Sequence, residues 1–436
     1  MAPSGPDLAH PDLARPDLTV RSASGGTRAV ERCRLLTRPP FSADPNGLTR
    51  AYLTPAHAEA CRQIAEWMAQ AGMEPRIDAA GNLIGRYSGA SDRPALLIGS
   101  HIDSVRDAGA FDGPLGVMLG IECAAALHLQ GRRLPFPIDV IAFGDEEGSR
   151  FPASMLTSRA VAGTLDPADL AIADGDGVTL AEALAGFGRD AGTFLSARYP
   201  TGSAFAYLEA HIEQGPVLEA EGLALGVVTA IAGQRRLAVT FTGTPGHAGT
   251  SAMTLRRDAL AAAAEAVLAV ERIARAGPDD LVATVGRLSV APGATNVVPG
   301  RVDFTIEGRA GADMVRDRAT AEILAALDTI GAARGIALAV EETQVLPASP
   351  CAPALAERLA DAVRTATGAP ARRLVSGAGH DAMVMAALAP TAMLFIRCTG
   401  GISHNPAEDV HAADVELALA AMLHFIEGLA AESEAA

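Results

Sequence analysis

Residues 96–120, LLIGSHIDSVRDAGAFDGPLGVMLG, limit the possible folds of this chain more than any other segment. The first four residues are apolar or small, which predicts a short buried strand. His101 and Asp103 follow that strand at its carboxyl end, where open α/β sheets bind their ligands. Asp112 comes after a glycine-containing loop, and Pro114 then begins an apolar helix. The segment therefore predicts a strand, loop and helix of an α/β fold with polar groups at the sheet edge.

His101 and Asp112 are candidate metal ligands. Neutral imidazole and carboxylate together suit zinc, manganese, cobalt or nickel, and Asp103 can fix the tautomer of His101. A histidine at a strand end that is paired with an aspartate is also an ordinary structural arrangement. The pattern therefore leaves both interpretations open, and the later motifs must decide between them.

Length and charge narrow the class of protein. A chain of 436 residues with 49% apolar residues is long enough for two folded domains. The net charge of −16 and the lack of a long basic run argue against a nucleic-acid or membrane partner. Surface charge is screened within about 10 Å, so an anionic substrate remains compatible if a local arginine binds it.

The cysteines and apolar runs indicate a cytoplasmic protein. Five cysteines are scattered without a C-x-x-C pair, which is typical of reduced thiols. The longest nearly uncharged run, residues 382–396, is interrupted by Pro390 and is too short for a membrane span. The first twenty residues have no apolar centre of a signal peptide.

Residues 1–27 are expected to be a disordered tail. They contain PDLAH, PDLAR and PDLTV in succession, followed by small residues. So short a proline-rich segment buries too little surface to hold one shape, although a peptide that docks on a partner is the alternative. Folded structure is expected from Arg28 onward.

Alternating strands and helices predict a mainly parallel sheet. Thr54 is a plausible N-cap of a packing helix, residues 73–87 form a strand pair, and residues 137–143 form another buried strand. We expect a catalytic domain of residues 28–218 that is completed by residues 336–436.

The motif GDEEGSRF follows the strand of residues 137–143. The adjacent carboxylates of Glu146 and Glu147 repel each other, and a cation can compensate them. With two metals, one glutamate can bind an ion while the other takes a proton from water. A solvated acidic turn is the alternative.

The segment AYLEAHIEQ resembles the first motif, because a histidine again follows an apolar, strand-like run. His211 stands at the end of a second apolar run, with Gln214 three residues later. A lone histidine is more often structural, but a second one at a strand end favours a ligand role.

Residues 219–335 predict an inserted α+β domain. With a closing strand at residues 336–343, its elements follow the order βαββαβ of a ferredoxin-like sandwich, and its sheet edge could pair with a second copy. The insert contains His247 in a GHAGT turn, Asn296 in ATNVVPG, and Arg309 after a strand. Ordinary loop and surface roles are the alternatives for His247 and Arg309.

Two further motifs lie near the carboxyl end. SGAGHDA, with Gly379 and His380, fits the dinucleotide pattern G-x-G-x-x-A. We reject nicotinamide binding because no acidic residue stands about twenty positions later to bind a ribose. A tight turn that lets the backbone approach a substrate explains the glycines equally well. GGISHNPAED then places His404 in a loop before the last helix.

The ordered series HxD, FDG, EEGSRF, HIEQG, GHAGT, TNVVPG, GHDA and GGxSHNPAE resembles the two-metal amidohydrolases, which include aminoacylases, dinuclear carboxypeptidases and N-carbamoyl-amino-acid hydrolases. The likeness extends over about residues 28–430. His211, in place of a carboxylate, points to the carbamoylase branch. DEEGSRF, VRDAGAFDG and RCTGGISHNPAE look most like the allantoate amidohydrolases of that branch.

The resemblance implies two divalent ions per subunit, usually manganese, with zinc, cobalt or nickel as alternatives. It implies that His101 and His211 bind different ions and that Asp112 bridges them. The implied metal ligands are His101, Asp112, Glu147, His211 and His404. Asp103 would orient His101, and Glu146 would be the general base.

The resemblance also implies a homodimer in which the insert acts across subunits. His247 would stabilise the oxyanion, while Asn296 and Arg309 would bind the carboxylate of a small ureido acid. The implied pocket lining is Gln214, Gly379 and His380. Glu307 and Gly308 depart from the Asp and aliphatic residue common before this arginine, which leaves the aim of Arg309 open.

The leading hypothesis is therefore hydrolysis of a linear ureido amide, with allantoate as substrate. An N-carbamoyl-L-amino acid is the nearest alternative, and a dipeptide is a more distant one. A binding or scaffold protein without turnover is the alternative from another class.

Overall fold

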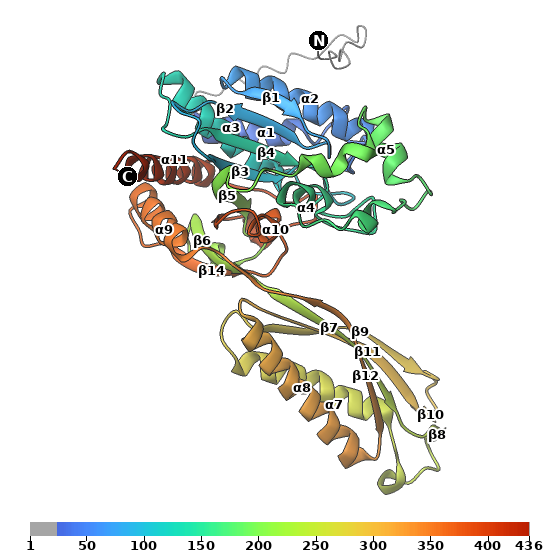
Figure 1. Ribbon diagram of the computed structural model, residues 1–436. Coiled ribbons are helices and arrows are strands. Elements are labelled where there is room, and N and C mark those ends of the chain that lie inside the picture. Colours follow the sequence, from blue (N-terminus) through green and yellow to red (C-terminus); the bar gives the residue numbers. More distant parts are fainter. Residues whose placement is uncertain (1–23, 436) are drawn as a thin grey trace. The chain divides into compact units, whose positions relative to one another are not determined.

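The computed structural model describes residues 24–435 (Figure 1). The chain divides into two compact units. The first comprises Met1–Val228, Cys351–Arg373 and His380–Ala436, and the second comprises Thr229–Pro350 and Leu374–Gly379. None of the described helices combines the length and apolarity needed to cross a membrane.

A nine-stranded sheet has the order β1-β2-β4-β3-β5-β15-β6-β13, and β14 also pairs with β6. Its central strands β4, β3, β5 and β15 are parallel to one another, while β1, β2, β6 and β13 pair antiparallel. The strands are β1 (Glu74–Ile77), β2 (Leu83–Tyr87), β3 (Ala95–His101), β4 (Ile138–Phe143), β5 (Ala204–Ile212), β6 (Leu225–Ile231), β13 (Ser349–Pro350), β14 (Arg372–Ser376) and β15 (Thr391–Ile396).

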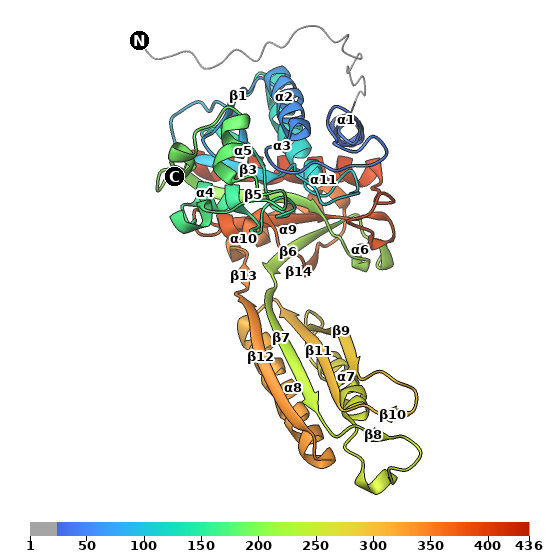
Figure 2. The same ribbon diagram turned by 90° about the vertical axis from the view of Figure 1, so that its right-hand side faces the viewer.

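The central strands are apolar throughout because both faces of the sheet are covered. Every residue of β3, β4 and β15 is buried. Helices α1, α3 and α11 pack on one another, with α3 on β3, β4 and β5, and α10 contacts β3, β5 and β15 (Figure 2). The helices of this unit are α1 (Gly25–Leu35), α2 (Pro55–Gln70), α3 (Pro114–Leu129), α4 (Leu156–Ala162), α5 (Leu180–Gly186), α6 (Val217–Ala220), α9 (Pro353–Thr367), α10 (Asp381–Met385) and α11 (Ala412–Ala435). Short 3-10 helices span Pro167–Leu170, Ala191–Ala197 and Thr399–Gly401.

Local chemistry explains where the first helices begin. Thr54 caps α2, since its hydroxyl oxygen accepts a hydrogen bond from the backbone N–H of His57. Gly113 precedes α3 with φ +86°, a left-handed conformation that favours glycine. A Cβ at Gly113 would lie only 2.5 Å from ring atoms of His101. This glycine therefore begins the helix and leaves room for a predicted metal ligand.

We expect Gly116→Ala to destabilise the first unit by about 1–3 kcal/mol. A Cβ at Gly116 of α3 would lie 2.2 Å from the carbonyl oxygen of Ala210 in β5, and backbone cannot move aside easily. Urea unfolding of the two proteins measures the difference. Gly186→Ala is the matched control in α5, because a Cβ there meets no atom within 4 Å; it should raise stability slightly. Equal unfolding midpoints for Gly116→Ala and the parent protein would contradict this reading of the helix contact.

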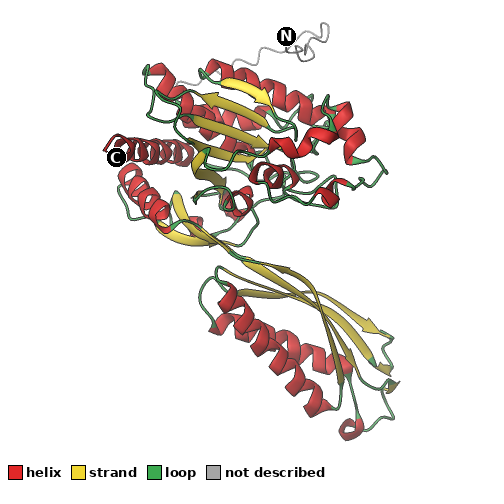
Figure 3. Cartoon of the chain, viewed as in Figure 1, coloured by secondary structure: helices red, strands yellow, loops and turns green. Residues whose placement is uncertain are grey.

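The second unit has the order βαββαβ, with four antiparallel strands in the order β12-β7-β11-β9. Helices α7 and α8 lie on one face of this sheet (Figure 3). Its elements are β7 (Gly233–Thr242), β8 (Gly246–His247), α7 (Ala259–Ala276), β9 (Val282–Ala291), β10 (Val297–Val298), β11 (Arg301–Ala310), α8 (Asp313–Arg334) and β12 (Ala337–Leu346), with a 3-10 helix at Met253–Leu255. Phe241 and Phe304 are central to the apolar core between sheet and helices.

The structure confirms the predicted α/β class, the mainly parallel central sheet and the ferredoxin-like order of the second unit. The expected tail of residues 1–27 lies mostly outside the described residues, which begin at Ser24. Its last three residues, Gly25 to Thr27, are instead the first turn of α1. They are helical because Glu416 of α11 accepts hydrogen bonds from the backbone N–H and the hydroxyl of Thr27.

Candidate metal centre

Asp112, itself buried, is the centre of a cluster of ionisable side chains at the carboxyl edge of the parallel strands, in which His404 is the exposed member. Its Oδ1 lies 3.2 Å from Nε2 of His211 and 3.7 Å from Nε2 of His101. Its Oδ2 lies 3.2 Å from Nε2 of His404. These side chains come from the ends of β3 and β5, from the loop before α3, and from the loop after β15. Parallel strands end at one edge of the sheet, which brings together residues far apart in the sequence.

Asp112 belongs to two groups of possible metal ligands. One group is His101, Asp112 and His211, and the other is Asp112, Glu147 and His404; within each, the ligand atoms lie within 4.8 Å of one another. The shared carboxylate suits a pair of cations. His101 and His211 fall in the same group, since both imidazoles face one oxygen of Asp112 from the neighbouring strands β3 and β5; this arrangement favours one shared ion, where the resemblance implied different ions.

Asp103 connects the first histidine to the glutamate motif. Nδ1 of His101 lies 3.1 Å from the carbonyl oxygen of Asp103 and 3.5 Å from its carboxylate. The two carboxylate oxygens of Asp103 accept hydrogen bonds from the backbone N–H groups of Glu146 and Glu147, at 3.1 and 3.2 Å. His101, Glu146 and Glu147 form a third group of ligand atoms within 4.8 Å. Asp103 thus lies where it can orient His101 and fix the glutamate loop.

The charges of the cluster favour a bound cation. Burial disfavours the charged forms, yet hydrogen bonds to Asp103 and Asp112 raise the pKa of His101 well above its usual value. Burial raises the pKa of Glu146, although the positive charge of His101 opposes this shift. Nε2 of His211 is buried, with Oδ1 of Asp112 at 3.2 Å. A bound cation would neutralise these carboxylates. Imidazole nitrogens and carboxylate oxygens together suit zinc, manganese, cobalt or nickel.

We expect apparent metal affinity to rise with pH up to about 9, the pKa to which the hydrogen bond with Asp112 raises His404. An ion must displace the proton, so each displaced proton changes affinity about tenfold per pH unit below that value. The raised pKa values of His101 and His211 steepen the slope. Competition with a fluorescent chelator between pH 6 and 9 measures how the metal affinity changes with pH. An affinity that does not change with pH would rule out ligand binding by these imidazoles.

Glu408 is a residue that the sequence analysis did not single out. Its Oε1 accepts hydrogen bonds from the backbone N–H groups of Phe111 and Asp112, at 2.8 and 3.1 Å. The hydroxyl of Ser403 lies 2.9 Å from Asp112 Oδ2 and 3.1 Å from Glu408 Oε2. Glu408 therefore positions the loop of the shared carboxylate. Its place in the SHNPAED motif, four residues after His404, was the available signal.

We expect Glu408→Ala to weaken metal binding by roughly 10–100-fold, as loss of a residue that orients a ligand commonly does. The two backbone N–H groups would lose their buried acceptor, and the loop of Asp112 would loosen. Glu408→Gln retains Oε1 and should restore most of the affinity. Metal titration of both variants gives the comparison, and circular dichroism checks that they fold. Equal affinity in Glu408→Ala and the parent would show that the loop does not need this carboxylate.

The expected pocket residues of the first unit lie beside the cluster. Nε2 of Gln214 donates a hydrogen bond to Asp112 Oδ2 at 2.9 Å, so its contact here is with a predicted metal ligand. The His380 ring packs edge-on against His211, with centroids 4.4 Å apart. Burial, followed by the charge of His211, lowers the pKa of His380 well below its usual value and favours its neutral form.

Glu209 is a second residue missed by sequence analysis. It is fully buried in β5, two residues before His211. Its carboxylate accepts hydrogen bonds from the Ser100 hydroxyl, the Tyr207 hydroxyl and the Ala382 N–H, at 3.1, 3.0 and 2.8 Å. These bonds connect β3, β5 and α10 beneath the cluster. A charged residue inside an apolar strand was the signal.

His247 and Asn296 lie together in the second unit. Strand β8 pairs with β10, and the N–H of Ala248 donates to the carbonyl oxygen of Asn296 at 2.9 Å. The N–H of Gly249 donates to Nδ1 of His247 at 3.0 Å, and the His247 side chain is exposed. The pair is therefore preformed on the surface of that unit.

Arg309 is fixed by two groups of the second unit. Its Nε donates to Glu307 Oε1 at 2.6 Å, and its Nη1 donates to the carbonyl oxygen of Gly377. A Cβ at Gly308 would meet no atom within 4 Å. In this structure Glu307 aims the guanidinium, and Gly308 leaves open space on the other face of β11. Gly379 is the last residue of the second unit.

Comparison with known proteins of similar sequence and fold identifies the family of this chain. Residues 97–428 match peptidase family M20/M25/M40. A probable allantoate deiminase of Oryza sativa subsp. japonica is 42% identical, over 89% of this chain and 86% of the relative. An N-carbamoyl-L-amino acid amidohydrolase of Geobacillus stearothermophilus is 40% identical, over 88% of this chain and 94% of the relative. A crystal structure of an amidase of the hydantoinase/carbamoylase family from Burkholderia multivorans superposes with a TM-score of 0.86 at 35% identity, over 93% of this chain and 98% of that one.

The family match covers most of the chain and includes the strand that delivers His101 as well as the loop of His404. The similar relatives carry names of amidohydrolases and deiminases, in agreement with the resemblance seen in the motifs. The chain belongs to peptidase family M20/M25/M40, in its branch of allantoate and N-carbamoyl-L-amino-acid amidohydrolases, and is a hydrolase of C–N bonds.

Proposed function

We propose that this protein hydrolyses a ureido C–N bond of allantoate with one water, which releases ammonia and leaves a carbamate; the carbamate then loses carbon dioxide, and its nitrogen takes a proton to give a ureidoglycine-type product. The observation that carries the proposal is the buried Asp112 shared by two groups of ligand atoms, with Glu146 beside His101. The 42% identity to a probable allantoate deiminase supports this substrate.

Five residues would hold two divalent ions, with manganese as our first choice: His101, Asp112, Glu147, His211 and His404. Such ions, when bound, polarise a carbonyl and acidify water. Glu146 takes a proton from the attacking water and delivers it to the leaving nitrogen. Its pKa, raised by burial, suits a group that must both accept and release a proton.

The proposal also assigns the residues that bind the substrate. Gln214, Gly379 and His380 line the pocket for the ureido acid. His247 donates a hydrogen bond to the developing oxyanion, and Asn296 and Arg309 bind the substrate carboxylate. We propose that these last three act from the partner subunit of a homodimer. A cytoplasmic location is part of the proposal, since all five cysteines are buried and unpaired.

An N-carbamoyl-L-amino acid is the second candidate substrate, with the same mechanism. The 40% identity to an N-carbamoyl-L-amino acid amidohydrolase favours it. Both substrates have a urea-type carbonyl and a carboxylate, so the same ligands and arginine serve either one. A dipeptide lacks the urea-type carbonyl and is disfavoured.

Parallel assays decide between the substrates. Manganese-loaded protein is given allantoate, a series of N-carbamoyl-L-amino acids and a dipeptide, and release of ammonia or amino acid is followed with and without a chelator. Metal-dependent ammonia from allantoate, at a higher kcat/KM than for any carbamoyl amino acid, supports the proposal. Turnover of a carbamoyl amino acid alone selects the second candidate. A protein that binds metal but turns over none of them is a binding protein instead.

A further inference from the structure

A cavity lined by several charged residues lies at the amino-terminal edge of the parallel strands, the edge opposite the metal cluster. Its volume is about 430 Å³, within the range of small-molecule sites. Pro94 directly precedes β3, Asp139 is the second residue of β4, and Ser203 directly precedes β5; all three line the cavity. His101 is at the other end of β3, which at seven residues spans roughly 20 Å. The cavity is therefore separate from the catalytic edge.

Four arginines line this cavity, in a chain of net charge −16. The side chains of Arg76 and Arg198 have no hydrogen-bond or ion-pair partner within the part of the chain that the structure describes. Arg93 donates to the carbonyl and hydroxyl oxygens of Ser433, which are uncharged. Arg86 is the exception, since it lies 3.4 Å from Asp139. Three of the arginines that line the cavity, all with exposed side chains, therefore have no ion pair with a carboxylate among the described residues.

Three acidic residues also line the cavity, and Arg76 interacts electrostatically with two of them, Asp78 and Asp139, without forming an ion pair. Asp78 accepts hydrogen bonds from the Asn82 side chain and from backbone N–H groups of its own turn. Asp92 is exposed at the rim. Asp139, fully buried, accepts a hydrogen bond from the Tyr199 hydroxyl on Oδ2 at 3.0 Å. Its Oδ1 is buried and has no partner among the described residues, so this oxygen needs a donor.

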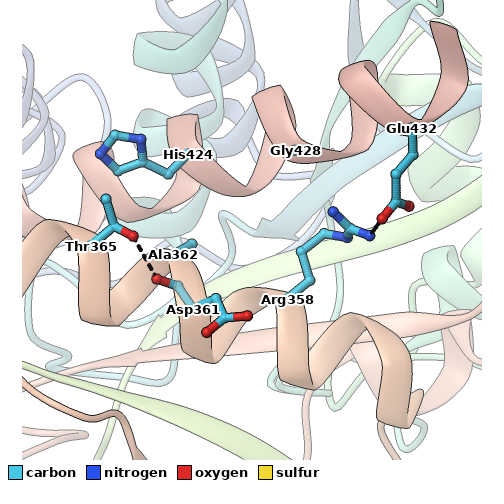
Figure 4. A pocket seen from close by; sticks show the side chains of 7 residues that line it. All are labelled: Arg358, Asp361, Ala362, Thr365, His424, Gly428 and Glu432. Atoms are coloured by element: carbon cyan, nitrogen blue, oxygen red, sulfur yellow. Dashed lines mark hydrogen bonds and ion pairs between the residues drawn. The ribbon is translucent and has the colours of Figure 1, made fainter. Parts of the chain in front are cut away.

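Two of the arginines are already positioned. Gly163 lies against Arg198, where a Cβ would fall 2.5 Å from Nε and 2.7 Å from Cδ. The bonds to Ser433 fix Arg93. Another cavity, of about 410 Å³, lies between α9 and α11 and differs in how its arginine is paired (Figure 4). Its one arginine, Arg358, is already paired with Glu432, so it offers no unpaired guanidinium.

We propose that the arginine-lined cavity binds a small organic acid that carries a hydroxyl or amino group. The guanidinium groups bind the carboxylate in the bidentate manner typical of arginine, and the ligand's O–H or N–H donates to Oδ1 of Asp139. The site lies at the edge of the sheet opposite the metal cluster, so its occupant does not compete with the substrate.

Isothermal titration of the metal-loaded protein tests this site with glycolate, glycine and acetate as probes. Acetate is the matched ligand without a donor group. Arg76→Gln and Arg198→Gln remove one unpaired guanidinium each, and Arg38→Gln is the control, because that exposed arginine lies outside the cavity. Turnover of each variant without added ligand checks that the fold and the catalytic edge are intact.

We expect glycolate or glycine to bind at least tenfold more tightly than acetate. Each cavity variant should lose at least tenfold in affinity, while Arg38→Gln binds as the parent does and all variants keep parental turnover. Unchanged affinity in both cavity variants would overturn the site. Equal affinity for acetate and glycolate would overturn the role of Asp139. Tighter binding of inorganic phosphate than of glycolate, lost in the same variants, would overturn the assignment to an organic acid.

Discussion

Glu146→Gln is expected to lower kcat by roughly 10²–10⁴-fold, the usual contribution of a general base. Glutamine has nearly the same shape as glutamate but cannot accept the proton of the attacking water. Glu146 lies outside the two groups of ligand atoms that share Asp112, so the variant should bind close to the parental amount of metal. Steady-state kinetics and metal analysis of the same preparation measure both properties.

Glu147→Gln is the matched control for this experiment. Glu147 belongs to the group of Asp112 and His404, so its replacement should lower metal content together with activity. A Glu146→Gln protein that retained more than a tenth of the parental kcat would contradict the assignment of the general base. Loss of metal from Glu146→Gln would instead make that residue a ligand.

Mixing two inactive variants is expected to restore activity if the insert acts across subunits. His247→Ala should lower kcat by about 10²–10³-fold, as loss of an oxyanion donor does. In a hybrid dimer of His247→Ala with Glu146→Gln, one active site would receive an intact His247 and an intact Glu146. A statistical mixture should then recover about a quarter of the parental activity, since half of the dimers are hybrids with one complete site each.

The same experiment has a clear contrary result. If His247 served the cluster of its own chain, every hybrid site would lack either the histidine or the glutamate, and mixing would restore nothing. Size-exclusion chromatography of the parent protein supplies the oligomeric state. A doubly substituted chain, mixed with the parent, is the control for subunit exchange: it should dilute the activity of the parent without adding to it.

Much of the candidate site could be predicted because its ionisable residues occur in short sequence motifs. Strand β3 ends at His101 and β5 has His211 as its next-to-last residue, so parallel pairing places both imidazoles at one edge of the sheet. The paired glutamates follow β4, which comes between β3 and β5 in the sequence and pairs with β3 in the sheet. These relations are local, so residue order was enough to nominate His101 and Asp112 as candidate ligands, whereas only the family resemblance implied that Asp112 is the shared carboxylate.

Other features could not be read from the sequence because they depend on distant contacts. Which imidazoles share an oxygen of Asp112 follows from the neighbouring positions of β3 and β5. The support that Glu408 gives to the loop of Asp112 joins residues almost three hundred positions apart. Helix α1 begins earlier than expected because Glu416, far along the chain, binds its first turn.

The sequence by itself determined the alternation of strands and helices, the ferredoxin-like order of the insert, and the chemical type of each candidate ligand. These properties depend on periodicity and on neighbours within a few residues. Only the tertiary structure decided how the ligands group around Asp112, how Glu307 aims Arg309, and that arginines gather at the opposite edge of the sheet. The physical reason is that strand pairing and packing between distant segments set distances, and distances decide which charges meet.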